Sequence, residues 1–264
     1  MGSIFVRRKI GLALGGGAAR GLAHIGVLKV LQEEGIRIHC VAGTSAGSLI
    51  GSLFCAGLSW EKIKEIAQDI DWSDLVSPTW PSLGIVNPDK LEKTLNKIVQ
   101  KKRFEDLSIP FRAVAVDITS GEEVVLRSGS VARAVRASCS IPGIFQPTEV
   151  EGRLLVDGGL VNDVPTDVVR DMGADRVIGV DLNADRVVSK RPENLIEIFF
   201  RSLNILIHNG AQQARRVADV MVVPRLAGFA YHDLSRLDEL IVRGEQAMRD
   251  QIGTLLKIDR KSVV

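Results

Sequence analysis

The chain has 264 residues, of which 45% are hydrophobic and 25% charged, a composition typical of a globular protein with a sizeable core. Its net charge of +2, from 34 basic and 32 acidic residues, provides no global field that would favour nucleic acid or an anionic surface. The three cysteines lie far apart and outside any C-x-x-C motif, so neither a disulfide framework nor a zinc site is indicated.

The sequence shows no secretory signal and no membrane-spanning segment. Its longest apolar-rich stretch, residues 196–207, contains Glu197, Arg201 and Asn204 and is far shorter than the roughly 20 apolar residues that a spanning helix needs. We therefore expect a soluble, cytoplasmic protein that binds no nucleic acid, and we leave open whether it lies against the inner membrane surface.

Apolar runs alternate along the chain with stretches of helical periodicity. Several runs, such as residues 113–116 and 177–180, are continuous and rich in β-branched residues, which is typical of parallel strands buried on both faces. The pattern predicts a three-layer α/β/α fold with a mainly parallel central sheet. In chain order we expect a strand at 9–14, a helix at 18–35, a strand at 38–43, helices at 45–57, 59–69 and 88–100, paired strands at 111–119 and 122–129, a helix at 130–138, a hairpin within 148–159, a helix at 165–173, a strand at 176–183, a helix at 195–216, a strand at 220–226 and a helix at 237–256.

One segment, residues 69–88, has three prolines and no clear period, and it contains Trp72 and Trp80. Long irregular segments in compact domains are often lids or binding loops, and the alternative is that both tryptophans pack into the domain. No repeat, low-complexity segment or linker interrupts the chain. We therefore expect a single domain over residues 1–264, with a motif-bearing core at about 9–226 and a C-terminal helix at about 235–258.

The glycine-rich stretch LALGGGAARG, residues 12–21, does not fit either common nucleotide motif. A dinucleotide fingerprint requires a third glycine where Arg20 stands, and a P-loop requires Lys and Ser or Thr after Gly21, where Leu22 follows. What remains is a junction of strand, glycines and helix, whose backbone N–H groups form an anion cradle. Enzymes of acyl transfer need such a cradle for an oxyanion; a tight turn without a ligand is the alternative.

The pentapeptide GTSAG, residues 43–47, follows a predicted strand and opens a predicted helix. This is the setting of a nucleophile elbow, in which Ser45 is exposed at the end of the sheet. Gly43 and Gly47 carry no Cβ atom where strand and helix approach most closely. The alternative is that Ser45 only caps the helix.

The base that serves Ser45 has two kinds of candidate. Among the histidines, His24 lies on an apolar helix face and is expected to be structural, and only His232, in a loop, is placed as in a catalytic triad. Asp157 instead ends an apolar strand and is followed by Gly158 and Gly159. A partly desolvated carboxylate within hydrogen-bond reach can deprotonate a serine directly; the alternative for Asp157 is an ordinary Asx turn.

Together and in this order, GGGAARG, GTSAG and DGG resemble the motifs of the patatin-like phospholipase family, its bacterial members in particular. The resemblance implies a Ser–Asp dyad without histidine. It makes Ser45 the nucleophile and Asp157 the general base. The segment ASCSIPGIF, residues 137–145, looks like a further family block near the active site, and Leu14 stands where plant patatins have Asp. The resemblance also implies an oxyanion hole formed by the amides of Gly15, Gly16 and Gly17, with supporting roles for Arg20, Gly21, Gly43, Gly47, Gly158 and Gly159.

The function implied by this resemblance is hydrolysis of lipid carboxylic esters, as a phospholipase, lysophospholipase or esterase, through an acyl-enzyme intermediate. It implies neither a cofactor nor a metal, and its partner is a lipid or acyl-ester substrate. Contact with a membrane surface and homo-oligomerisation are left open. The alternatives are acyl transfer by the same dyad and a non-catalytic member of the fold that binds lipid or regulates a partner.

Overall fold

The computed structural model describes residues 8–69, 77–78, 86–185, 191, 198, 202, 205, 207, 214, 216–231 and 233–259. Most of the helix expected at 195–216 lies outside these residues, although the described positions within it are helical. Trp72, Trp80, His208 and His232 also lie outside them. The prediction of a lid at 69–88 and the alternative histidine base therefore stay predictions.

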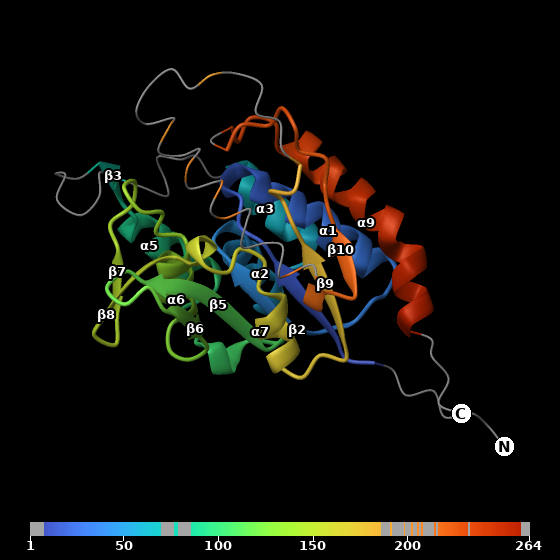
Figure 1. The fold of residues 1–264 in the computed structure, drawn as a ribbon, viewed down its shortest axis with the longest axis horizontal. Helices are drawn as coiled ribbons and strands as arrows, with labels where there is room; N and C mark the ends of the chain where they lie inside the picture. Colours follow the sequence, from blue (N-terminus) through green and yellow to red (C-terminus); the bar gives the residue numbers. More distant parts are fainter. Residues whose placement is uncertain are drawn as a thin grey trace.

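The centre of the molecule is an eight-stranded mixed sheet with the order β10-β9-β1-β2-β5-β8-β7, in which β6 also pairs with β5 (Figure 1). The strands from β10 to β5 are parallel, while β8, β7 and β6 pair antiparallel, so the two predicted hairpins are present. The strands are β1 (Ile10–Leu14), β2 (Ile38–Thr44), β5 (Phe111–Asp117), β6 (Glu123–Leu126), β7 (Thr148–Val150), β8 (Arg153–Asp157), β9 (Arg176–Val180) and β10 (Val220–Val222).

The helices follow the predicted order with small differences at their ends. The helix expected at 18–35 is a 3-10 turn followed by an α-helix, and the segment expected to be irregular contains two short paired strands, β3 (Ser77–Pro78) and β4 (Val86–Asn87). The helical elements are η1 (Ala18–Leu22), α1 (Ala23–Glu33), α2 (Ala46–Cys55), α3 (Trp60–Asp69), α5 (Asp89–Ile98), η2 (Phe104–Asp106), α6 (Val131–Ser138), η3 (Gly158–Leu160), α7 (Thr166–Asp171) and α9 (Leu237–Asp259).

The two faces of the sheet are covered by different helices, as a three-layer fold requires. Because side chains alternate along a strand, Leu12 and Leu14 of β1 face a large core cluster that includes residues of α1, α2 and α9. Ala13 of β1 faces the other way, into a smaller cluster with Val168 and Val169 of α7. The larger apolar residues thus point to the thicker helical layer.

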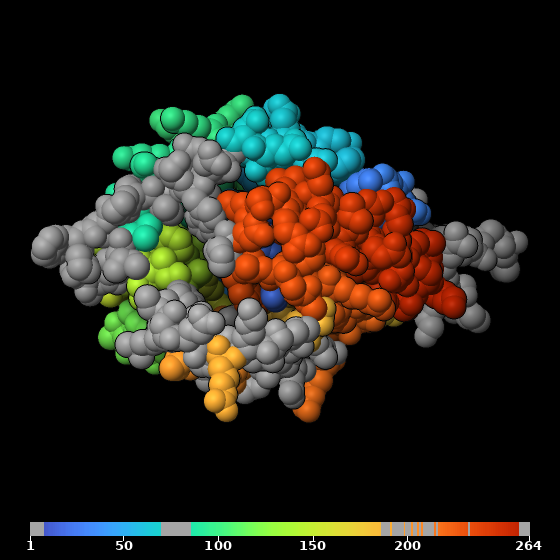
Figure 2. Space-filling model, turned by 90° about the horizontal axis from the view of Figure 1, so that it is seen from above, coloured from blue at the N-terminus to red at the C-terminus, as the bar shows by residue number. Residues whose placement is uncertain are grey.

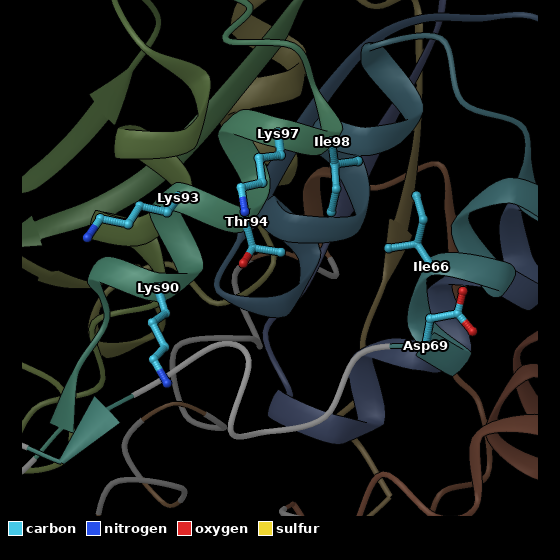
Figure 3. A pocket seen from close by; sticks show the side chains of 7 residues that line it. All are labelled: Ile66, Asp69, Lys90, Lys93, Thr94, Lys97 and Ile98. Carbon is cyan, nitrogen blue, oxygen red and sulfur yellow. The ribbon is translucent and has the colours of Figure 1, made fainter.

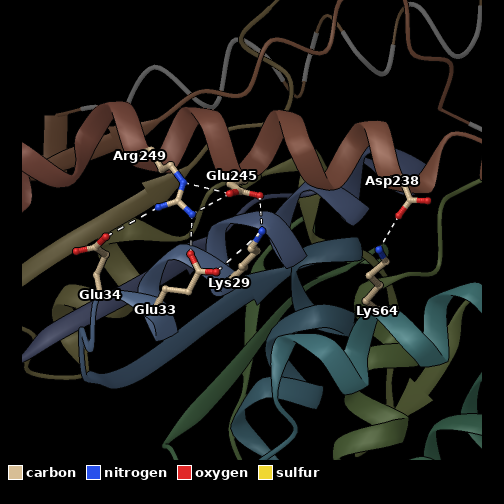
Figure 4. Close-up of polar contacts among 7 residues, drawn as sticks. All are labelled: Lys29, Glu33, Glu34, Lys64, Asp238, Glu245 and Arg249. Atoms are coloured by element: carbon tan, nitrogen blue, oxygen red, sulfur yellow. Dashed lines mark hydrogen bonds and ion pairs between the residues drawn. The ribbon is translucent and has the colours of Figure 1, made fainter.

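The C-terminal helix α9 lies along the outer side of α1 (Figure 1). The two helices meet at glycines: a Cβ atom on Gly26 would be 1.9 Å from the Ile241 carbonyl oxygen, and one on Gly244 would be 1.8 Å from the Ala23 oxygen. Lys29–Glu245 and Arg249–Glu33 are ion pairs between these two helices, and Lys64 of α3 pairs with Asp238 of α9 (Figure 4). Figure 2 shows the same C-terminal segment, orange to red, beside the cyan surface of α3.

The strand register places three motifs at the same end of neighbouring strands in the sheet. Leu14 of β1 pairs with Gly43 of β2, so the glycine loop and the GTSAG turn leave adjacent parallel strands side by side. Asp157 of β8 pairs with Ala115 of β5, the strand next to β2. Residues more than 100 positions apart in sequence are brought together by this pairing.

Candidate active site

Ser45 forms a tight turn between β2 and α2. Its backbone has φ 52° and ψ −124°, a sparsely populated conformation that costs roughly 1–3 kcal/mol and is common at functional sites. It occupies the N-cap position of α2, but its side chain makes no capping hydrogen bond, so the alternative that Ser45 serves only as a cap is wrong. Its carbonyl oxygen accepts from Ser48 and Leu49, which starts the helix without the hydroxyl.

The glycines around Ser45 are required by close backbone contacts. A Cβ atom on Gly47 would be 2.0 Å from the Leu14 carbonyl oxygen, and one on Gly43 would be 2.5 Å from the Gly47 oxygen. The supporting positions Gly21 and Gly158 are equally tight, at 2.4 Å from the Ala46 Cβ atom and the Val114 oxygen respectively. These contacts bring α2 directly onto the end of β1, where the glycine loop begins.

Asp157 lies at the end of β8 and faces the Ser45 side chain, which acts on the pKa of Asp157 as a hydrogen-bonding group. Its Oδ1 atom also accepts from the Gly159 amide at 2.9 Å, which is the Asx turn considered above. The turn and the contact with Ser45 are therefore compatible, and the turn orients the carboxylate. Burial raises the pKa of Asp157 to about 6, against the opposing effect of the Ser45 and Gly159 hydrogen bonds.

The glycine loop lies against Ser45, since a Cβ atom on Gly16 would be 3.3 Å from the Ser45 Cβ atom. Its amides differ from the predicted set. The Gly15 amide donates to the Val180 carbonyl at 3.0 Å, and the Gly16 amide donates to Asp163. The two amides of the loop that have no acceptor among the described residues are those of Gly17 and Ala18.

The three predicted oxyanion amides therefore differ in the acceptors that they meet. Gly15 and Gly16 use their N–H groups to anchor the loop, because β1 continues its pairing with β9 and the next residue meets a buried carboxylate. Ala18, with a positive φ of 47°, follows Gly17 and brings a second amide into the loop. Successive amides that lack internal acceptors form an anion-binding concavity. The motif of three glycines does not indicate Ala18, because only the glycines stand out in it.

Arg20 and His24 support the loop from behind. Arg20 donates through Nε to the Phe229 carbonyl and through a terminal nitrogen to the Tyr231 hydroxyl, and its guanidinium lies 4.1 Å from the Tyr231 ring centre. These contacts hold the Arg20 side chain against the segment that contains Phe229 and Tyr231. His24 Nε2 lies 2.8 Å from the Gly15 carbonyl oxygen, and burial lowers the pKa of His24 to about 4. His24 is therefore a neutral donor inside the core, as a structural histidine should be.

Three polar residues of this site had no signal of their own in the sequence. Ser138, in the ASCSIPGIF segment, accepts from the Ser45 amide at 2.9 Å. Asp163 and Asn183 contact the glycine loop and each other. Asn183 follows a buried strand and Asp163 follows the DGG turn, so a search for polar residues after strand ends next to the motifs would have found both.

A separate hollow of about 530 Å³ lies between α3 and α5 (Figure 3). Neither Ser45 nor Asp157 lines it. Its lining residues are Ile66, Asp69, Lys90, Lys93, Thr94, Lys97 and Ile98.

Comparison with known proteins gives the family of this chain. A strained serine turn, a buried carboxylate and a glycine loop at the end of a mixed sheet define a class of α/β proteins with a nucleophile elbow. The family model for patatin-like phospholipase matches residues 12–170, more than half of the chain. The protein belongs to the patatin-like phospholipase family.

The matched relatives are longer proteins, of which this chain covers only a part. It is 38% identical over 185 residues to patatin-like phospholipase domain-containing protein 6 of Mus musculus, covering 66% of this chain and 14% of the mouse protein. It is also 38% identical over 184 residues to an uncharacterized NTE family protein of Mycobacterium bovis, covering 66% of this chain and 49% of that protein. The chain thus spans less than half the length of these relatives.

Solved structures share the fold. VipD from Legionella pneumophila matches with a TM-score of 0.68 and 16% identity, covering 96% of this chain and 67% of VipD. ExoU from Pseudomonas aeruginosa matches with a TM-score of 0.56 and 15% identity, covering 97% of this chain and 54% of the other. None of the described helices has the length and apolar composition needed to span a lipid bilayer.

Proposed function

We propose that this protein is a serine acyl hydrolase that cleaves carboxylic esters of lipids through Ser45 and Asp157. The observation that carries the proposal is the position of the Ser45 side chain beside a buried carboxylate whose pKa burial raises to about 6. A carboxylate with this pKa is ionised at neutral pH and is a stronger base than an exposed aspartate. The nearby amides of Gly17 and Ala18 supply the donors that an oxyanion requires.

The mechanism follows from these positions. Asp157 takes the proton from Ser45 Oγ as that oxygen attacks the ester carbonyl, and the Gly17 and Ala18 amides donate to the oxyanion of the tetrahedral intermediate. The intermediate collapses, the C–O bond to the alcohol breaks, and the alkoxide leaves with the proton held by Asp157. Water then attacks the acyl-enzyme while Asp157 accepts its proton; the bond from the acyl carbon to Ser45 Oγ breaks, Asp157 returns the proton to Oγ, and the free acid leaves.

The substrate class rests on the family. Relatives carry the names phospholipase and, for a protein of Drosophila melanogaster that is 37% identical over 185 residues, neuropathy target esterase. We therefore propose lipid esters, such as phospholipids and lysophospholipids, as the substrate class, because they fit both these names and the proposed chemistry. The acyl-enzyme is common to hydrolysis and acyl transfer, so product analysis with added glycerol or lysolipid distinguishes the two.

The test is hydrolysis of p-nitrophenyl esters of increasing chain length by wild type, Ser45→Ala and Asp157→Asn, with Asp250→Asn on the outer face of α9 as the matched control. Activity in wild type and control, lost in the other two, supports the proposal. Intact mass after treatment with a fluorophosphonate should show one adduct that Ser45→Ala lacks. Full activity in Ser45→Ala would exclude this serine as the nucleophile.

A further inference from the structure

The peptide between Gly16 and Gly17 is held from its carbonyl side. Asn183 Nδ2 donates to the Gly16 carbonyl oxygen at 3.2 Å. The C=O and N–H groups of a trans peptide point in opposite directions, and the described chain has no cis peptide bond. A donor that fixes the Gly16 oxygen therefore also fixes the direction of the Gly17 N–H, one of the two loop amides for which the described part of the chain offers no acceptor.

Asp163 holds the N–H side of Gly16. The Gly16 amide donates to both the Asp163 carbonyl oxygen and Oδ1, each at 3.2 Å. The second carboxylate oxygen, Oδ2, accepts from Asn183 Nδ2 at 3.0 Å. Asp163 is 2% exposed, and burial raises its pKa well above the ordinary value, with the nearby carboxylates of Asp181 and Asp157 acting in the same direction. Asp163 is therefore held in a buried position.

A chain of contacts fixes the orientation of the Asn183 amide. The Tyr231 hydroxyl donates to Asn183 Oδ1 at 3.1 Å, and Arg20 donates to that hydroxyl at 3.2 Å. The backbone N–H of Asn183 donates to Asp181 Oδ1 at 2.9 Å. With Oδ1 engaged as an acceptor, the NH₂ group is the part of Asn183 that faces Gly16 and Asp163, and it has two donors for these two acceptors.

We propose that Asn183 and Asp163 are positioning residues that clamp the Gly16–Gly17 peptide and thereby aim the Gly17 N–H at the oxyanion formed on Ser45. The proposal rests on the acyl-hydrolase function proposed above. Glycines have no side chain that would hold the loop in place, and they allow many backbone conformations. Oxyanion stabilisation requires donors that are already in position, so this loop needs a rigid support, and Asn183 and Asp163 supply it from outside.

The experiment compares Asn183→Leu and Asp163→Leu with Asp163→Asn, which keeps an acceptor for the Gly16 N–H. The matched control is Thr166→Val, which removes a buried hydrogen bond to the Ala214 carbonyl. Steady-state kinetics on p-nitrophenyl butyrate give kcat and KM, and thermal melts report stability. Amide ¹H–¹⁵N NMR of the substrate-free protein follows the Gly17 resonance without any need for turnover.

We expect Asn183→Leu to lower kcat about tenfold or more with KM within about twofold, a smaller loss than the roughly 10²–10³-fold that follows removal of an oxyanion donor itself. The Gly17 resonance should shift in both leucine variants, and Asp163→Asn should recover most of the kcat that Asp163→Leu loses. Thr166→Val should keep its kcat despite a comparable fall in melting temperature.

Two results would overturn the proposal. The first is an unchanged kcat and an unchanged Gly17 resonance in Asn183→Leu. The second is a loss of kcat in Thr166→Val that is as large as the loss in Asn183→Leu for the same fall in melting temperature. A wild-type protein that hydrolyses no ester, with a Gly17 resonance that still moves in Asn183→Leu, would refute the acyl-hydrolase function. It would at the same time support the positioning of this amide by Asn183.

Discussion

The backbone amide of Ser45 donates to the hydroxyl of Ser138 at 2.9 Å, and that hydroxyl in turn donates to the Val114 carbonyl at 2.6 Å. Ser138 is the last residue of α6 and is fully buried. One side chain thus joins the serine turn, a helix end and the strand β5. Because the Ser45 backbone is strained, an anchor of this kind has a direct effect on the shape of the turn.

We expect Ser138→Ala to destabilise the protein by about 1–3 kcal/mol, because the Ser45 N–H loses its only acceptor among the described residues in a buried site. Ester hydrolysis should fall as well, since the turn is free to relax. Urea unfolding and kinetics on the same preparation measure the two effects. Ser52→Ala is the matched control, because the buried Ser52 hydroxyl donates only to the Leu49 carbonyl within α2. Equal activity in the two variants would contradict a role for Ser138 in shaping the turn.

The pH dependence of kcat/KM should report the ionisation of Asp157. The proposed base must be ionised, and burial raises its pKa to about 6, so activity should rise through about pH 6 and reach a plateau above it. His24, with a pKa lowered to about 4, is neutral across this range and should contribute no transition. A profile on a neutral ester that stays flat from pH 5 to pH 8 would argue against Asp157 as the base.

The same carboxylate should limit stability at neutral pH. Its pKa is raised from 3.8 in the unfolded chain to about 6 in the folded protein, so its contribution is fully present below pH 3.8 and is lost as pH rises through 6. The difference corresponds to about 3 kcal/mol. Asp157→Asn, which keeps an acceptor for the Gly159 amide, should therefore be more stable than wild type at pH 8 and close to it near pH 4.

Urea unfolding of wild type and Asp157→Asn at the two pH values checks this prediction. Asp250→Asn, an exposed change on α9, should leave the unfolding free energy unchanged at both. A stabilisation of Asp157→Asn that is the same at pH 4 and pH 8 would show that the cause is not the buried charge. A gain in stability together with a loss of turnover would be the expected cost of keeping a base in the core.

Gly47→Ala should destabilise the protein by about 3 kcal/mol or more and abolish activity, because the new Cβ atom would meet the carbonyl oxygens of Leu14 at 2.0 Å and Gly15 at 2.7 Å. These are backbone atoms at the start of the glycine loop, so they cannot move without it. Gly253→Ala is the control: nothing lies within 4 Å of its added Cβ atom, and it should stabilise α9 by about 0.5–1 kcal/mol. Thermal melts of the two variants with opposite signs would agree with the contacts, and an active, stable Gly47→Ala would not.

Much of this molecule could be predicted from local pattern. Continuous apolar runs predicted the strands, because a strand buried on both faces needs apolar side chains on both. The spacing of Leu22, Ile25, Leu28 and Leu31 predicted the first helix, because apolar residues three positions apart lie on one face of a helix. The family follows from three short motifs, in which Gly43, Gly47 and Gly158 lie too close to backbone atoms for a Cβ atom to fit. Each of these features depends on residues that are close in sequence or on a single close contact, so it can be recognised from the residue types alone.

What the tertiary structure alone decided is which group faces which. Three glycines predicted three free amides. The Gly15 amide instead donates to the neighbouring strand, and the Gly16 amide donates to Asp163, which lies 147 residues away. Among the described residues, only the Gly17 and Ala18 amides of the loop have no acceptor. Ser138 and Asn183 contact the site only because β5 and β9 flank β2 and β1 in the sheet. A hydrogen bond depends on direction and on distances of a few tenths of an ångström, and these arise from packing between distant segments rather than from residue type.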